Sequence, residues 1–211
     1  MDQGNPEEEV ERLKKFWNEY GNSLIAGVVI GVAALFGWRY WQQHTDTQAL
    51  AASSLYTEVM MAMSQNRVQP ARESATRLVA DYDDTPYAGL AALVLARLDY
   101  DAGDKAGAEK QLRTAMDTAR DDSVRHAAAL RLARLLLDAG KTDEALVLVE
   151  GKSVGGFASE YAELRGDILL AKGDRAAART AYQEAVKALK QESPYLPLLS
   201  MKLDDAGGAT P

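Results

Sequence analysis

Few side chains in this sequence have the types and spacing that catalysis or metal binding requires. The 211 residues include no cysteine and only two histidines, His44 and His126, which lie far apart. Without cysteine the chain has no thiolate nucleophile, disulfide, zinc finger or iron–sulfur cluster. A catalytic triad or a histidine metal site would depend on one of the two imidazole rings. We expect both histidines to be ordinary surface or helix-end residues.

Two other patterns have residue types found in chemical sites. Gly151-Lys152-Ser153 resembles the end of a phosphate-binding loop, but Leu146 stands where that motif needs its first glycine. A helix, not a strand, is predicted before it, so the segment is interpreted as a loop between repeats. The acidic clusters at 81–84 and 121–122 are predicted at helix boundaries, where carboxylates suit helix N-termini better than a metal. We therefore expect no enzyme activity, cofactor or metal.

The first structural element that the sequence predicts is an uncharged segment from Tyr20 to Trp38. About 19 helical residues span roughly 28 Å, close to the thickness of a bilayer core. Aromatic residues flank it as they flank membrane-spanning helices: Phe16, Trp17, Tyr20, Trp38, Tyr40 and Trp41. The pattern predicts a transmembrane helix over 21–41 after a stub of residues 1–20.

Three alternatives compete with an uncleaved anchor, of which a surface amphipathic helix is excluded because the stretch has no polar face. A cleaved signal peptide needs small residues just past its apolar core, and the chain has Trp38-Arg39-Tyr40-Trp41 there. A buried helix of a soluble domain is disfavoured because the apolar stretch is rich in glycine. Gly27 and Gly31 form a small-xxx-small pair, typical of a transmembrane packing face. The alternative is that glycine is simply common in membrane helices.

Orientation follows the basic residues beside the predicted span. Arg12, Lys14 and Lys15 precede it, whereas only Arg39 follows it closely. The positive-inside rule therefore predicts a cytoplasmic N-terminus, with the part after about residue 42 outside, in the periplasm of a bacterium. The net charge of −7 argues against nucleic acid as a partner.

Beyond residue 44 the apolar residues follow a helical period, and glycines divide the chain into repeats. Gly103, Gly140 and Gly173 are spaced by 37 and 33 residues, as in tetratricopeptide repeats. A small residue recurs seven positions before and five positions after each glycine, where paired helices must touch: Ala96, Ala133, Gly166, Ala108, Ala145 and Ala178. The pattern predicts an all-α protein with a tetratricopeptide-like solenoid of helical hairpins over 42–205. HEAT-like pairs are the alternative.

The ends of this solenoid give weaker signals. Helices at about 49–63 and 70–82 are predicted to form a degenerate capping repeat. Ser193-Pro194 is typical of a helix start, with a closing helix predicted through Leu203. Residues 206–211 are predicted to form a flexible tail.

Solenoids bind partners along the concave face, which the first helix of each pair lines. Arg97 and Arg134 are equivalent positions one repeat apart, and with apolar neighbours they would suit an extended peptide with acidic or carbonyl groups. Alternatively, Asp101 and Asp138 neutralise them from i+4. The predicted partner-binding groove comprises Leu93, Arg97, Tyr100, Leu130, Arg134, Leu137, Glu160, Glu163, Asp167 and Leu170.

The combination of motifs resembles the YfgM family, the ancillary subunits of the bacterial SecYEG translocon. The motifs are Phe16-Trp17, Tyr20-Gly21, Gly37-Trp38-Arg39-Tyr40-Trp41, Thr85-Pro86-Tyr87-Ala88, Leu164-Arg165-Gly166-Asp167 and Lys172-Gly173-Asp174. The resemblance implies a single-pass inner-membrane protein with a periplasmic repeat domain. It also implies association with the translocon and with a membrane-anchored prolyl isomerase chaperone, so that emerging polypeptides pass to periplasmic chaperones.

Two other functions stay open on the sequence. A periplasmic repeat protein could organise an envelope or cell-division complex, although such proteins usually have a cleaved signal and often a coiled coil. A stress-signalling regulator could act through the cytoplasmic stub, which has only about 20 residues and is too short for a domain.

Overall fold

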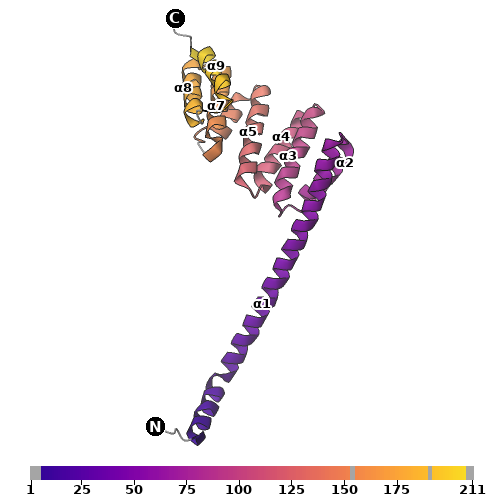
Figure 1. The fold of residues 1–211 in the computed structure, drawn as a ribbon, viewed down its shortest axis with the longest axis vertical. Coiled ribbons are helices and arrows are strands. Elements are labelled where there is room, and N and C mark those ends of the chain that lie inside the picture. The colour runs from indigo at the N-terminus through magenta and orange to yellow at the C-terminus, as the bar shows by residue number, and fades with distance from the viewer. Residues whose placement is uncertain (1–5, 153–154, 190–191, 208–211) are drawn as a thin grey trace. The chain divides into compact units, whose positions relative to one another are not determined.

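The computed structural model describes residues 6–152, 155–189 and 192–207, and over these ranges it is helical without a strand (Figure 1). The chain divides into two compact units, Met1–Leu50 and Ala51–Pro211. The helices are α1 (Pro6–Ser64), α2 (Val68–Asp81), α3 (Pro86–Asp101), α4 (Lys105–Thr118), α5 (Asp122–Asp138), α6 (Thr142–Val149), the 3₁₀ turn η1 (Gly155–Phe157), α7 (Ala158–Ala171), α8 (Arg175–Ala188) and α9 (Leu196–Gly207). The all-α prediction is confirmed.

The first unit is the N-terminal part of α1, and its large apolar side chains face outward. Ile25, Ile30 and Phe36 are at least half exposed. Among the described residues no single helix has both the length and the apolarity of a membrane span. The stretches Val10–Gly21 and Ile25–Ser64, bent by 54°, meet these criteria only as a pair, by length and composition alone.

The second unit is a succession of helix pairs. The last turns of α1 precede α2, and the following pairs are α3 with α4, α5 with α6, and α7 with α8 (Figure 1). The predicted helices at 49–63 and 70–82 correspond to the last part of α1, which ends at Ser64, and to α2 at Val68–Asp81, but no helix begins near 49 because α1 is a single helix from Pro6. A continuous buried cluster runs from α3 to α7 and includes Leu112, Leu132 and Ile168. Each pair thus buries its apolar face against the next pair, as in a solenoid.

The three repeat glycines form the same turn inside each pair. Gly103, Gly140 and Gly173 have positive φ angles of 81°, 74° and 85°, a region that glycine occupies without steric cost. In each turn the glycine N–H donates to the carbonyl three residues earlier, and the next N–H donates to the carbonyl five residues earlier. This pair of hydrogen bonds is the Schellman motif, which ends the first helix and satisfies its last carbonyls.

The six small residues predicted at the helix–helix contacts are all buried. Ala133, Ala145 and Ala178 have no exposed surface, and Ala108 is 1% exposed. The repeat register read from the sequence is therefore confirmed: these positions lie where the helices of a pair meet.

The closing helix differs from its predicted bounds. It begins at Leu196 and not at Pro194. Pro197 has no N–H, so it fits only in the first turn of a helix, where the N–H groups have no partner within the helix. A helix that began at Pro194 would place Pro197 at a later position. Ser193 instead forms a turn, in which its carbonyl accepts from the N–H of Leu196 at 3.1 Å. The helix also extends through Gly207.

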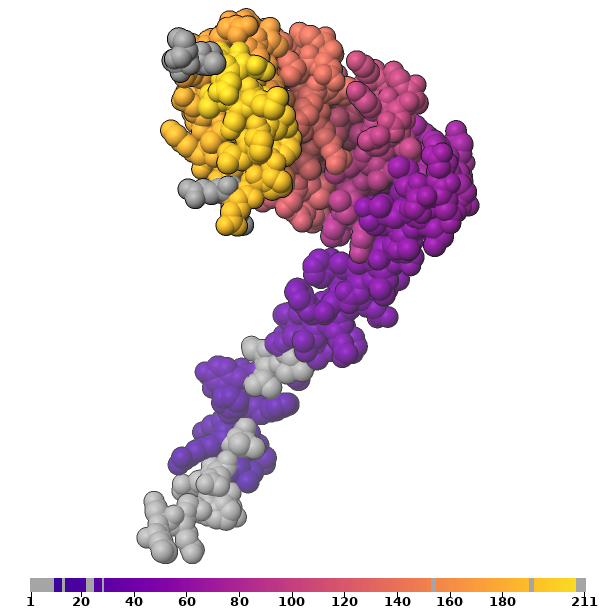
Figure 2. All heavy atoms as spheres, turned by 45° about the horizontal axis from the view of Figure 1, so that its top comes forward, coloured from indigo at the N-terminus to yellow at the C-terminus, as the bar shows by residue number. Residues whose placement is uncertain are grey.

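The predicted tail of residues 206–211 is wrong at its start. Ala206 is helical and 1% exposed, because it packs with Ala178 and Tyr182 of α8. Residues 208–211 lie outside the described part of the chain. In the space-filling view the yellow α9 covers the last helix pair (Figure 2).

Candidate functional site

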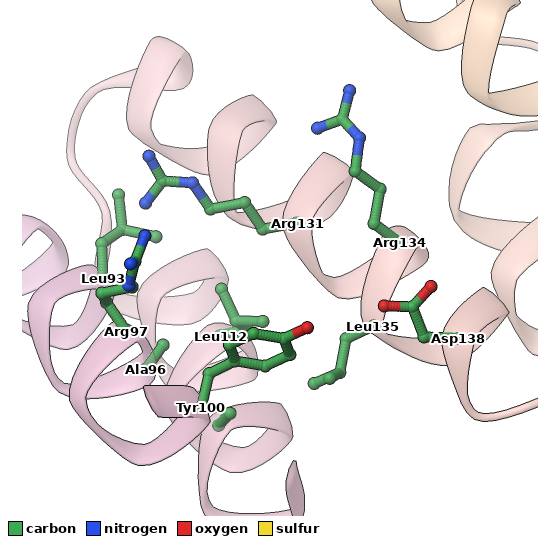
Figure 3. Close-up of a pocket in the computed structure, with 10 residues that line it drawn as sticks. Leu93, Ala96, Arg97, Tyr100, Leu112, Arg131, Arg134, Leu135 and Asp138 are labelled. Carbon is green, nitrogen blue, oxygen red and sulfur yellow. The ribbon is translucent and has the colours of Figure 1, made fainter. Parts of the chain in front are cut away.

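A pocket of about 410 Å³ lies in the second unit, where α3, α4 and α5 meet (Figure 3). Four of its lining residues come from α3, two from α4 and four from α5. They are Leu93, Ala96, Arg97, Tyr100, Ala108, Leu112, Arg131, Arg134, Leu135 and Asp138. We call this the α3–α5 pocket.

Helical spacing places these residues on one face of each helix. On α3, positions 93, 96, 97 and 100 follow the i, i+3, i+4, i+7 pattern, and on α5 positions 131, 134, 135 and 138 repeat it. The alanines and leucines among them are buried, whereas Arg97, Tyr100, Arg131 and Arg134 are exposed. The pocket therefore has an apolar floor and an exposed rim of three arginines, Tyr100 and Asp138.

The arginines of this rim differ in their partners. Arg97 Nε donates to Asp101 Oδ2 at 2.7 Å, and this hydrogen bond raises the pKa of Arg97 above its usual value. Within the described residues, neither Arg131 nor Arg134 has a carboxylate oxygen within 4.0 Å of its guanidinium nitrogens. Figure 3 shows Arg134 pointing away from Asp138. The ion pair with the aspartate at i+4 thus forms at Arg97 and, among the described residues, not at Arg134.

The pocket brings together four of the residues predicted for the groove: Leu93, Arg97, Tyr100 and Arg134. Arg131 was missed. Its position one helical turn before Arg134 is a usable signal in the sequence, although Arg131 has no basic equivalent in the other repeats. Position 131 corresponds to Val94 in the preceding repeat, so repeat equivalence could not reveal a basic group there.

The other predicted groove residues do not line this pocket. Leu130 is buried in the main core at 4% exposure, and Leu137 packs against that core. Leu170 packs against the small cluster formed by α8 and α9. Glu160 is half-buried, and its Oε2 is a buried atom without a hydrogen-bond partner in the described structure.

Glu163 and Asp167 hold the closing helix. Lys202 Nζ of α9 donates to Glu163 Oε1 at 2.7 Å and to both carboxylate oxygens of Asp167 at 2.8 Å. Tyr182 O–H also donates to Asp167 Oδ1 at 2.7 Å. Burial alone would lower the pKa of Lys202, but the hydrogen bonds to these two carboxylates outweigh it, so the pKa is raised. Glu163 and Asp167, which were predicted to line the groove, therefore bind α9 to α7 within the chain.

The other residues considered for chemistry have structural environments. His126 is partly buried: its Nδ1 lies 2.9 Å from the hydroxyl of Tyr161, and its ring packs on Phe157. It joins α5 to α7, which corrects the expectation of a surface or helix-end residue. His44 packs its ring parallel to that of Tyr40. Gly151 follows α6 with a φ of 66°, as expected of a loop, and Ser153 lies outside the described residues.

The described residues include no group of three or more acidic or histidine side chains placed to hold a metal ion. That the protein is non-catalytic and free of cofactors stays a prediction. Asp121 caps α5 by accepting from the N–H of Ser123 at 2.7 Å, which lowers its pKa. One of the acidic clusters thus occupies a helix N-terminus as predicted.

The fold and the pocket define the class: a tetratricopeptide-like solenoid with a basic-rimmed groove. A family described as Tetratricopeptide repeat-like domain matches residues 14–208. A crystal structure of nearly identical TPR-like repeats from Podosopora anserina superposes with a TM-score of 0.55 at 21% identity, covering 73% of this chain and 84% of that one. This likeness concerns the fold alone.

Curated relatives narrow the class further. The chain is 35% identical over 184 residues to the "Ancillary SecYEG translocon subunit" of Escherichia coli (strain K12), covering 87% of this chain and 88% of the relative. It is 32% identical to the protein of the same name from Haemophilus influenzae, covering 88% and 90%, and 26% identical to that of Neisseria gonorrhoeae, covering 94% and 95%. The chain belongs to the family of ancillary SecYEG translocon subunits, which confirms the resemblance stated from the sequence.

Proposed function

We propose that this protein is an inner-membrane adaptor that associates with the SecYEG translocon and binds a protein partner through its repeat domain. The names of the relatives support the association with the translocon. The observation that carries the binding role is the α3–α5 pocket, where Arg131 and Arg134 are exposed beside a buried apolar floor and form no ion pair with any residue that the structure describes. Such a surface suits recognition, and we assign it no catalytic step.

The anchor of this adaptor is the segment at 21–41, with residues 1–20 in the cytoplasm and 42–205 in the periplasm. The basic residues Arg12, Lys14 and Lys15 support this orientation. Gly27 and Gly31 are the proposed packing face for a transmembrane helix of the translocon. A Cβ placed on either glycine would have no neighbour within 4 Å among the described residues, and such small residues let another helix approach closely.

The periplasmic partners we propose are a membrane-anchored prolyl isomerase chaperone and unfolded secreted polypeptides. A tethered repeat domain would raise the local concentration of such partners at the site where polypeptides emerge. The adaptor would then act by placing the chaperone and the client chain together, with weak individual contacts made effective by the shared anchor.

Photocrosslinking from single positions in living cells tests this function. A photoreactive residue replaces Ile30 in the proposed span, Tyr100 in the α3–α5 pocket, or Gln183 on the exposed side of α8 as a control. We expect adducts with a translocon subunit from position 30, and adducts with a chaperone or a secreted chain from position 100. Adducts from position 183 that match those from position 100 would contradict the groove assignment, and loss of all translocon adducts would contradict the adaptor role.

A further inference from the structure

We propose that the α3–α5 pocket recognises an acidic protein segment, in which a carboxylate bonds Arg131 and Arg134 while a neighbouring apolar side chain rests on the pocket floor. This inference rests on the proposed binding role of the repeat domain. It adds the chemistry of the partner and assigns the central recognition to Arg131, a residue outside the groove predicted from the sequence.

The charge pattern supports an anionic occupant. Figure 3 shows three guanidinium groups around one pocket, those of Arg97, Arg131 and Arg134. Only Arg97 has an intramolecular carboxylate partner among the described residues. The lining also includes the carboxylate of Asp138, so it carries three positive charges and one negative charge, in a chain whose net charge is −7. Like charges gathered without partners cost free energy, and a bound carboxylate would remove that cost.

Comparison of equivalent positions in the repeats shows what the pocket lacks. Arg97, Arg134 and Asp167 each lie six residues before a repeat glycine. At the last repeat, Asp167 is bonded by Lys202 from the following helix α9. At the middle repeat, no acidic side chain of the described residues bonds Arg134. The charge at this position is thus paired within the chain at the last repeat, whereas among the described residues it has no ion-pair partner at the middle repeat.

The floor and the size of the pocket favour a peptide over a small anion. Leu93, Leu112 and Leu135 are each less than 10% exposed, and they supply an apolar surface that a free phosphate or sulfate would not use. Tyr100, 47% exposed, adds an aromatic ring and a hydroxyl at the same opening. A volume of about 410 Å³ accommodates a few side chains. Arginine and tyrosine are also the residue types that most often dominate protein interfaces.

The test uses the full-length protein in nanodiscs of phosphatidylcholine and a display library of random twelve-residue peptides. We expect selection to enrich peptides that carry aspartate or glutamate next to a leucine or an aromatic residue. Synthesis of the most enriched peptide, and of a copy with each carboxylate replaced by its amide, allows fluorescence anisotropy with both. The amide copy should bind at least tenfold more weakly, and binding of the acidic peptide should weaken as salt is added.

Two matched variants locate the site. Arg131→Gln with Arg134→Gln should weaken binding of the acidic peptide at least tenfold. Lys105→Gln with Lys110→Gln removes the same charge from exposed positions of α4 outside the pocket and should leave binding within twofold. Both double variants should keep the thermal midpoint of the parent, since none of the four side chains is buried or forms an ion pair with another described residue.

Three results would overturn the inference. The selection yields no peptide, it yields peptides without carboxylates, or the acidic peptide binds the Arg131→Gln, Arg134→Gln variant as tightly as the parent. Arginine-dependent binding to phosphatidylglycerol vesicles in the absence of peptide binding would replace the proposed occupant with a lipid headgroup. The translocon adducts from position 30 do not depend on this pocket, so failure here would be distinguishable from failure of the adaptor role.

Discussion

Gly166 and Tyr182 meet so closely between α7 and α8 that a Cβ atom on Gly166 would lie 2.5 Å from Cε1 of the tyrosine ring. The ring is fixed, because Tyr182 is 1% exposed and its hydroxyl donates to Asp167 Oδ1 at 2.7 Å. Burial, followed by this hydrogen bond, also raises the tyrosine pKa. Glycine is therefore required at 166 by the neighbouring side chain and not by an unusual backbone angle.

Gly166→Ala is expected to lower the free energy of unfolding by about 1–3 kcal/mol, the usual cost of overpacking. This loss opposes the gain of up to about 1 kcal/mol that alanine normally brings to a helix interior. Urea denaturation of a fragment comprising residues 45–211 measures the change. Gly156→Ala is the control, because a Cβ there meets no described residue within 4 Å.

A double-mutant cycle identifies the tyrosine ring as the cause. In a Tyr182→Leu background, Gly166→Ala should cost less than in the parent, since the clashing ring is gone. An equal cost in both backgrounds would mean that the contact between Gly166 and Tyr182 does not set the penalty.

The middle repeat offers a second test of the helix–helix contacts. Ala133 has no exposed surface, whereas Ala106 on α4 is exposed. We expect Ala133→Leu to destabilise the same fragment by about 1–3 kcal/mol and to lower its melting temperature, because α5 and α6 would be forced apart. Ala106→Leu adds the same atoms at the surface and should change stability by less than about 0.5 kcal/mol. Similar melting temperatures for the two variants would contradict the repeat register.

The three repeat turns differ in their helix caps, which gives a third prediction. Asp104 and Asp174 accept from the N–H groups of Gly107 and Ala177 at 2.8 and 3.0 Å, while Lys141 stands at the same position without a side-chain cap. Asp104→Ala and Asp174→Ala should each cost about 1 kcal/mol. Lys141→Ala should cost less than about 0.5 kcal/mol, because it removes only an exposed pair with Glu109. Equal losses in urea denaturation at all three positions would show that capping is not the cause.

The repeat fold could be predicted because its determinants are local. The glycines at 103, 140 and 173 need positive φ angles, and the alanines around them need close helix contacts, so both leave a regular mark in the sequence. The start of α9 was misplaced because two prolines, Pro194 and Pro197, satisfy the same first-turn rule, and only packing decides between them.

The candidate site was predicted in part for a related reason. Arg97 and Arg134 could be predicted because they occupy equivalent positions in two repeats. Arg131 has no basic equivalent in the preceding repeat, and it lines the pocket only because α5 packs beside α3. Lys202 forms ion pairs with Glu163 and Asp167, which lie 39 and 35 positions before it in the sequence. Periodicity does not record such a contact, because α9 is not a full copy of a repeat.

The ion pairs of Lys202 predict a pH dependence at high pH. A lysine whose pKa is raised on folding contributes stability that is fully present below its unfolded pKa, about 10.4, and is lost as pH rises through the folded value. Lys202→Met should therefore destabilise the fragment most at neutral pH. The cost should be about 1–3 kcal/mol there, below that of a fully buried pair because the lysine side chain is 28% exposed.

The measurement is the difference in unfolding free energy between parent and variant, by urea denaturation from pH 7 to 11. We expect this difference to stay constant up to about pH 10 and to shrink above it. Lys187→Met, at an exposed position of α8, is the control and should give no pH-dependent difference. A Lys202→Met difference that grew with pH would have the wrong sign for a raised lysine pKa.

The absence of cysteine in the sequence makes the proposed topology testable in the full-length protein. Glu11→Cys and Ala106→Cys place single thiols at exposed positions on the two sides of the proposed span. A maleimide that does not cross the inner membrane should label position 106 in cells with a permeabilised outer membrane, and position 11 only after lysis. Labelling of position 11 and not 106 in intact spheroplasts would reverse the orientation.

The basic residues before the span are the proposed cause of this orientation, so their removal should weaken it. With Arg12, Lys14 and Lys15 changed to glutamine, Arg39 becomes the nearest basic residue, and it lies on the opposite side. The positive-inside rule then predicts that a fraction of molecules inserts with position 11 outside, and that this fraction is labelled before lysis. Mass spectrometry of the purified protein should find the N-terminal residues retained. A mature N-terminus near Ala52 would show instead that the segment is a cleaved signal.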